Sequence, residues 1–204
     1  GHPDTIVHVG DDESKLSASE RTRCRITEED GQRKVYVCPD ATFKLEMDYL
    51  KKKVDAGADA IITQMFFDAN TYGAFLKACR KHGINVPVIP GIMLVQAAGG
   101  FRKMTAMCKT RVPAAVKESV DAKADNDVAL KAYGVDLGVQ ISHELLAVGA
   151  PGLHFYTLNL DKTTLAIAKR VADDRASSRT ARDWLKAAAL AAGAAVLVAL
   201  LRRK

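Results

Sequence analysis

Three short apolar segments, each followed by stretches of helical periodicity, constrain the fold of this 204-residue chain most strongly. The apolar segments are 60–66, 86–92 and 152–158, and their uncharged centres are typical of strands buried in a parallel sheet. Helices are predicted over 43–57, 69–83, 101–109, 125–148 and 163–172. Strands that alternate with helices in this way predict right-handed βαβ crossovers and an α/β fold.

Three strands are too few for a closed (β/α)8 barrel, which typically takes about 250 residues. The polar stretch before Phe43 adds one predicted hairpin, in which Arg25–Thr27 pairs with Lys34–Cys38 across Gly31. The chain is therefore predicted to be a partial (β/α)8 TIM barrel that carries a polar insertion.

Composition excludes several classes of protein. A hydrophobic content of 48% and a charged content of 26% are those of a folded globular chain, not of a disordered one. Of the 30 basic and 24 acidic residues, ten and three respectively lie within 162–204, so the net charge of +6 belongs to the tail. We therefore expect no nucleic-acid partner. The four cysteines form no C-x-x-C pair and have no histidine at ligand spacing, which predicts free thiols and no metal site.

The tail contains the uncharged run 187–201, which is followed by Arg202, Arg203 and Lys204. As a helix the run would reach about 22 Å, less than the roughly 30 Å of a hydrocarbon core, although Trp184 and Leu185 would lengthen it. Two interpretations stay open: a tail anchor over 184–204 in an intracellular membrane, and an alanine-rich helix packed on a partner or on the missing part of the fold. The expected location is the cytoplasm under both.

Candidate ligand-binding residues lie where the predicted strands end, because parallel α/β folds bind ligands at the carboxyl ends of their strands. Gln64 is a carboxamide in an apolar strand, and it could pair with the donor and acceptor edge of a flat heterocycle. The alternative is a glutamine bonded to neighbouring backbone. Gly91 allows the close approach of a ligand or a sharp turn. His154 is better interpreted as making one buried hydrogen bond than as a catalytic group, and the aromatic residues after it are better interpreted as core.

Six segments in order resemble methylenetetrahydrofolate reductases, the eukaryotic forms more closely than the bacterial ones. They are Gly1–Asp4, Asp48–Asp59, Ile61–Asp68, Val88–Met93, Ala132–Val135 and Pro151–Asn159. The resemblance covers about 43–172 and the first four residues, and it implies the last three strands of a (β/α)8 barrel. It also implies a flavoprotein of one-carbon metabolism, which reduces 5,10-methylenetetrahydrofolate to 5-methyltetrahydrofolate with NAD(P)H through FAD.

The resemblance assigns roles to individual residues. Gln64 matches the glutamine that contacts the folate pterin and, in the other half-reaction, the nicotinamide. His2 and Lys53 resemble flavin-contacting positions. Glu46, Tyr49 and Lys52 fall at further flavin contacts of the same helix, where the family has other residues. The implied cofactor is FAD, with NAD(P)H as co-substrate, and the implied complete enzyme is a homo-oligomer.

The chain also departs from the family. The family's general-acid glutamate belongs to the first strands of the barrel, which this chain lacks, so its catalytic residue is unknown. We therefore expect the chain to be truncated and to be inactive alone. Leu160 stands in place of a folate-binding arginine, and Gly99–Gly100 replaces a polar folate-contacting stretch. An alternative hypothesis is therefore a non-catalytic, tail-anchored half-barrel that pairs with another chain.

The expected divisions are 1–42, a barrel remnant with the insertion; 43–175, the half-barrel; and 176–204, the apolar tail helix.

Overall fold

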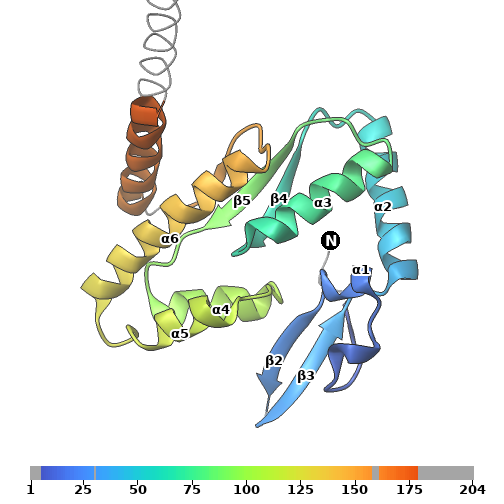
Figure 1. Cartoon of the computed structure of the whole chain (residues 1–204), viewed down its shortest axis with the longest axis horizontal. Helices are drawn as coiled ribbons and strands as arrows, with labels where there is room; N and C mark the ends of the chain where they lie inside the picture. Colours follow the sequence, from blue (N-terminus) through green and yellow to red (C-terminus); the bar gives the residue numbers. More distant parts are fainter. Residues whose placement is uncertain (1–5, 30, 158–160, 179–204) are drawn as a thin grey trace, which may run out of the picture.

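The computed structural model describes residues 6–29, 31–157 and 161–178. This part of the chain contains two separate three-stranded sheets, one antiparallel and one parallel. Figure 1 shows the antiparallel sheet at the lower right, below the parallel sheet and its helices. The fold is thus mixed α/β, as the sequence predicts, and the parallel sheet with its alternating helices is consistent with part of a TIM barrel.

The amino-terminal sheet has its own small core. Its strands are β1 (Val7–His8), β2 (Arg25–Glu29) and β3 (Gln32–Val37), in the order β1-β3-β2. The predicted hairpin is confirmed, since β2 and β3 pair antiparallel and Gly31 adopts a φ of +70° between them. The buried side chains are those of Leu16, Cys24, Val35 and Val37. This segment is therefore folded around apolar residues and is not simply a solvated excursion of the chain.

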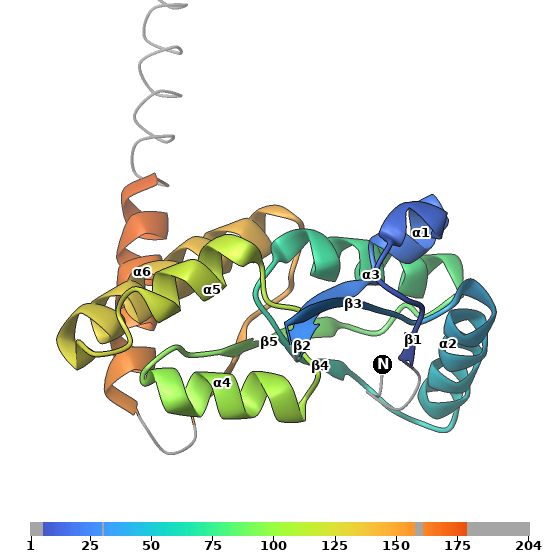
Figure 2. The same ribbon diagram turned by 90° about the horizontal axis from the view of Figure 1, so that it is seen from below.

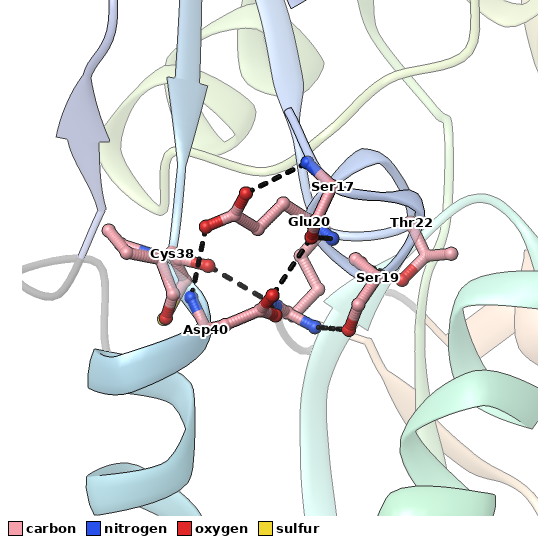
Figure 3. Close-up of polar contacts among 8 residues, drawn as sticks. Ser17, Ser19, Glu20, Thr22, Cys38 and Asp40 are labelled. Atoms are coloured by element: carbon pink, nitrogen blue, oxygen red, sulfur yellow. Dashed lines mark hydrogen bonds and ion pairs between the residues drawn. The ribbon is translucent and has the colours of Figure 1, made fainter. Parts of the chain in front are cut away.

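A polar network joins this sheet to the helix that follows it (Figure 3). Ser17 caps helix α1 (Ala18–Arg21) in a capping box with Glu20, whose Oε1 also accepts the backbone N–H of Asp40 at 3.1 Å. The Ser17 hydroxyl donates to Asp40 Oδ2 at 2.8 Å, and Arg23 forms an ion pair with the same carboxylate. Asp40 is the first residue of α2 (Asp40–Asp55), so two carboxylates couple α1 to α2.

The carboxylates of Glu20 and Asp40 are expected to make the junction between α1 and α2 sensitive to acid. Hydrogen bonds from the Arg23 guanidinium and the Ser17 hydroxyl hold the pKa of Asp40 below its ordinary 3.8. Backbone N–H groups of Ser17 and Asp40 hold the pKa of Glu20 below 4.5. Because both pKa values are lower in the folded state, their stabilisation is complete above about pH 4.5 and is lost as the pH falls through the depressed values.

The measurement is the urea midpoint of the chain and of Asp40→Asn between pH 2 and pH 6. We expect the midpoint of the unaltered chain to fall more steeply below pH 4.5 than that of the variant. Equal slopes would show that this junction contributes nothing to the acid sensitivity.

The parallel sheet contains β4 (Ile61–Phe66), β5 (Val88–Met93) and β6 (His154–Tyr156), in that order. All three predicted strands are confirmed, although β6 is shorter than the segment 152–158. Helix α3 (Ala69–Lys81) connects β4 to β5, and it begins at the predicted cap, where the Asp68 carboxylate accepts the Asn70 N–H at 2.9 Å.

Three helices connect β5 to β6. They are α4 (Ala98–Met107), α5 (Ala114–Asp121) and α6 (Asp127–Ala147), and a further helix covers 161–178. Helix α5 has no counterpart in the sequence-based expectation. Figure 2 shows α4, α5 and α6 at the left of the view and α2 and α3 at the right.

Side chains of the parallel sheet alternate between two apolar clusters. Phe66, Val88 and Ile92 pack in one cluster with residues of α2, α3 and α6. The neighbouring residues in sequence pack in the other cluster, with α4, α5 and the start of α6; these are Met65, Phe67 and Met93. Ile62 pairs with Ile89 on this second face and is 52% exposed, so the face is only partly covered within the described residues.

Glycines allow α6 to approach its neighbours closely. A Cβ at Gly134 would lie 1.9 Å from the carbonyl oxygen of Val95, and one at Gly138 would lie 2.4 Å from Cδ1 of Ile167. Ile167 and Val171 of the helix over 161–178 pack on α6 in a further cluster with Leu94 and Val139. Arg170 also pairs with Asp136 of α6 at 2.6 Å, so the last described helix is fixed to the rest of the fold.

Over 6–29, 31–157 and 161–178, the structure contains no helix that is long and apolar enough to cross a membrane. The predicted tail anchor over 184–204 lies outside the described residues and stays a prediction.

Candidate functional site

A bulge in β4 lies at the residue that the sequence singles out. Ile62 pairs with Ile89 and Met65 pairs with Gly91, so Thr63 and Gln64 together lie opposite Pro90. Pro90 occupies the middle of β5, not one of its ends. Proline has no N–H to donate, and it is tolerated there because the bulge interrupts the pairing with β4 and the pairing with β6 begins only at Gly91.

Side chains replace the ladder bonds that the bulge removes. The Gly91 N–H donates to Thr63 Oγ1 at 3.0 Å, and that hydroxyl donates to the Gln64 carbonyl at 2.9 Å. The Tyr156 hydroxyl, on β6, donates to the Thr63 carbonyl at 2.9 Å. The backbone of the bulge is therefore fixed by groups from β4, β5 and β6, which satisfies polar atoms that would otherwise lack partners.

Gly91 leaves room for the Tyr156 ring. A Cβ at this position would lie 2.6 Å from Tyr156 Cε2 and 2.5 Å from the Thr63 carbonyl oxygen. The space that Gly91 leaves is thus occupied by a side chain of the same chain, and the close approach of a ligand stays a prediction. His154 packs edge-on against Tyr156 with ring centroids 4.7 Å apart, and the buried hydrogen bond expected of it stays a prediction. Sequence reasoning missed Thr63 and Tyr156 as site residues, because no local pattern indicates a contact from β6 to β4.

Gln64 itself is exposed, and its Oε1 accepts the backbone N–H of Met65 at 3.0 Å. This is the bond to neighbouring backbone that the sequence left open as the alternative to ligand binding. The bond uses one lone pair of the carboxamide oxygen and neither of the two N–H donors of the amide. The side chain therefore combines an anchored oxygen with donor groups at an exposed surface.

The four α2 residues assigned to flavin contact lie at the surface of that helix. Glu46 is half-buried, whereas Tyr49, Lys52 and Lys53 are exposed. The Lys53 ammonium lies 4.3 Å from the centroid of the Tyr49 ring, so the structure brings these two together. The hydrogen bond of Gln64 is to its own strand and does not connect it to α2. His2, Leu160 and the first residues of the chain lie outside the described residues.

A cavity of about 330 Å³ lies between α1, the start of α3 and Arg111, and none of the predicted site residues lines it. Arginines line it, but the Asp68 carboxylate already caps α3 there, so the helix end is neutralised from within the chain.

Among the described residues no cluster of three or more His, Cys, Asp or Glu could hold a metal ion. The four cysteines are free, and burial raises the pKa of the Cys79 thiol.

Comparison with known proteins decides the family. The family model described as methylenetetrahydrofolate reductase matches residues 34–172, more than half of the chain. The chain belongs to the methylenetetrahydrofolate reductase family. The match begins within β3, earlier than the residue 43 expected from the motifs, and ends at residue 172, as expected.

Relatives of the chain come from plants, fungi and bacteria. It is 44% identical over 126 residues to methylenetetrahydrofolate reductase (NADH) 1 of Arabidopsis thaliana, covering 62% of this chain and 21% of the relative. It is 37% identical over 133 residues to methylenetetrahydrofolate reductase 1 of Schizosaccharomyces pombe, covering 65% of this chain and 22% of that protein. For 5,10-methylenetetrahydrofolate reductase of Escherichia coli the identity is 37% over 118 residues, covering 58% and 40%. The chain thus spans about a fifth of the length of these eukaryotic relatives.

Proposed function

We propose that the chain serves the reduction of 5,10-methylenetetrahydrofolate to 5-methyltetrahydrofolate with NAD(P)H and FAD, and that Gln64 binds the pterin. One observation carries this proposal: the family match spans β4, whose bulge presents Gln64 at an exposed surface. In this account β4, β5 and β6 are the last three strands of a (β/α)8 barrel, and the site lies at the bulge, in the carboxyl-terminal half of β4.

The chemistry of a carboxamide suits this ligand. The pyrimidinone edge of a pterin presents a donor beside an acceptor, and a glutamine side chain presents the complementary pair in one plane. The oxygen of Gln64 is held by the Met65 N–H, so less rotational freedom remains to be lost when a ligand binds. The same planar group can meet the carboxamide of a nicotinamide in the other half-reaction.

The residues of α2 fit a flavin dinucleotide in their chemistry. Lys52 and Lys53 supply two exposed cations, which suit a diphosphate, and Glu46 can accept hydrogen bonds from ribose or ribityl hydroxyls. Tyr49 offers an aromatic face, now occupied by the Lys53 ammonium. When bound, FAD supplies hydride transfer between NAD(P)H and the folate. His2 is a further proposed flavin contact.

Calorimetric titration of the full chain with 5-methyltetrahydrofolate tests the role of Gln64. Gln64→Ala removes the carboxamide, and we expect binding to weaken about 10- to 100-fold, the equivalent of one or two lost hydrogen bonds. Gln140→Ala is the matched control, because Gln140 is also exposed and bonded within its own element, to Glu144. Binding that is unchanged in Gln64→Ala, or absent from the unaltered chain, would contradict the proposal.

A second candidate is a non-catalytic chain that pairs with another chain through its parallel sheet. The exposed Ile62 favours it, since that side chain lies on a sheet face that is otherwise apolar, and β4 and β6 are edge strands in the described sheet. Absence of folate binding, together with a stable oligomer in solution, would favour this candidate over the first. The homo-oligomer implied by the family would bind folate as well.

A further inference from the structure

We infer that Tyr156 is a positioning residue, which fixes the bulge of β4 and thereby the direction of the Gln64 side chain. The inference rests on the proposed function only for its effect on folate binding. Its structural part, that Tyr156 holds the bulge, stands independently of any ligand.

The Thr63 carbonyl accepts a hydrogen bond from a side chain. In a regular parallel ladder this carbonyl would accept a backbone N–H of β5, but Thr63 belongs to the bulge, where the register is shifted and the Gly91 N–H donates to Thr63 Oγ1. The bond comes instead from the Tyr156 hydroxyl, at 2.9 Å. An unpaired carbonyl at this half-buried position would be costly, so the phenol stabilises one orientation of the Thr63 peptide.

The contact spans the whole sheet. Tyr156 lies on β6 and Thr63 on β4, and the two strands are separated by β5. The phenol reaches β4 by crossing Gly91, where any Cβ would lie 2.6 Å from the ring. His154 supports the ring from its own strand by the edge contact at 4.7 Å. Tyr156, supported by His154 and with the space that Gly91 leaves, therefore fixes the Thr63 peptide on β4.

The braced peptide is adjacent to Gln64. The Thr63 hydroxyl donates to the Gln64 carbonyl, and the Gln64 side chain accepts the Met65 N–H. Rotation of the Thr63 peptide would change the backbone torsions that aim Gln64, because a bulge sets the direction of its side chains. Tyr156 therefore acts on a ligand through Gln64, and pre-organisation of this kind is what a binding group needs from its neighbours.

Tyr156→Phe removes only the hydroxyl, and Tyr72→Phe is its matched control. Tyr72 donates a comparable bond of 2.8 Å to the Val88 carbonyl of β5, but it packs in the other core cluster. The first readout is amide hydrogen exchange at Met65 and Gly91 in the full chain without ligand. We expect Tyr156→Phe to speed exchange at both amides about tenfold, and Tyr72→Phe to change it less than twofold.

The second readout is the affinity for 5-methyltetrahydrofolate in a double-mutant cycle with Gln64→Ala. We expect Tyr156→Phe to weaken binding about fivefold when Gln64 is present and to have no further effect in Gln64→Ala, because coupled residues are not additive. A merely structural role would weaken binding equally in both backgrounds.

The outcomes separate the two claims. Unchanged exchange in Tyr156→Phe would overturn the positioning role, whether or not folate binds. Faster exchange with additive effects on affinity would show that Tyr156 holds the bulge without acting through Gln64, which also overturns the inference. If Gln64→Ala binds folate normally, the proposed function fails and the ligand part of the inference fails with it.

Discussion

Gly134→Ala is expected to lower the free energy of unfolding by about 3 kcal/mol, although alanine is normally the better helix former by up to about 1 kcal/mol. The added methyl would lie 1.9 Å from the Val95 carbonyl oxygen and 2.9 Å from its carbon, and both are backbone atoms. Neither can move aside as a flexible side chain would. Helix α6 must therefore shift away from the segment that follows β5, and the packing of Leu130 and Leu137 beside it is lost.

Gly73→Ala is the control for this substitution. Gly73 lies inside α3 and has no atom within 4 Å of an added Cβ, so the same change should stabilise the chain by up to about 1 kcal/mol. Urea denaturation of both variants gives the comparison. If Gly134→Ala is as stable as Gly73→Ala, the close contact between α6 and Val95 does not exist in solution.

Gly91→Ala should have the second large effect, because it disrupts the candidate site and the sheet together. The methyl would meet the Thr63 carbonyl at 2.5 Å and the Tyr156 ring at 2.6 Å. We expect a loss of about 2 kcal/mol in unfolding free energy and a loss of more than tenfold in affinity for 5-methyltetrahydrofolate.

A second substitution, at Tyr156, tests whether collision with the tyrosine ring causes the loss of stability in Gly91→Ala. Tyr156→Ala removes the ring that collides with the new methyl, so Gly91→Ala should cost less stability in that background, although the contact with the Thr63 carbonyl remains. The cycle is measured by urea denaturation. Strictly additive costs would mean that Tyr156 does not occupy the space above Gly91.

Local signals explain the parts of the fold that the sequence predicts well. Helix α3 follows from the Asp68 cap and from Gly83, which adopts a φ of +71° just after the helix ends. The amino-terminal hairpin follows from Gly31 between two segments of strand-forming residues. Each of these signals operates within a few residues of chain, so one sequence is enough to detect it.

The elements that the sequence does not predict depend on contacts beyond the local chain. Strand β1 has two residues and exists because β3 offers its edge. Helix α5 has eight residues and is held by Val116 and Val120 in a cluster with β5 and α4. Short elements of this kind have little intrinsic stability, and tertiary packing decides whether they form.

The candidate site also has one part that a local sequence signal predicts and another that depends on contacts beyond the local chain. Gln64 stands out in the sequence because an amide is unusual in an apolar strand. The bulge that exposes it depends on the register between β4 and β5, and the Tyr156 contact depends on a reach across three strands. No local sequence pattern indicates the register between two strands or a side-chain contact across a sheet. Thr63 and Tyr156 are therefore identified only in the structure.

An NMR titration of the full chain with 5-methyltetrahydrofolate tests whether the exposed amide of Gln64 is a folate-binding group. Saturable shifts are expected for the Gln64 side-chain amide and for the backbone amides of Met65 and Gly91. No shift is expected at the cavity beside Arg111. A spectrum in which the Gln64 amide does not move, while the ligand binds elsewhere or not at all, would contradict this role of Gln64.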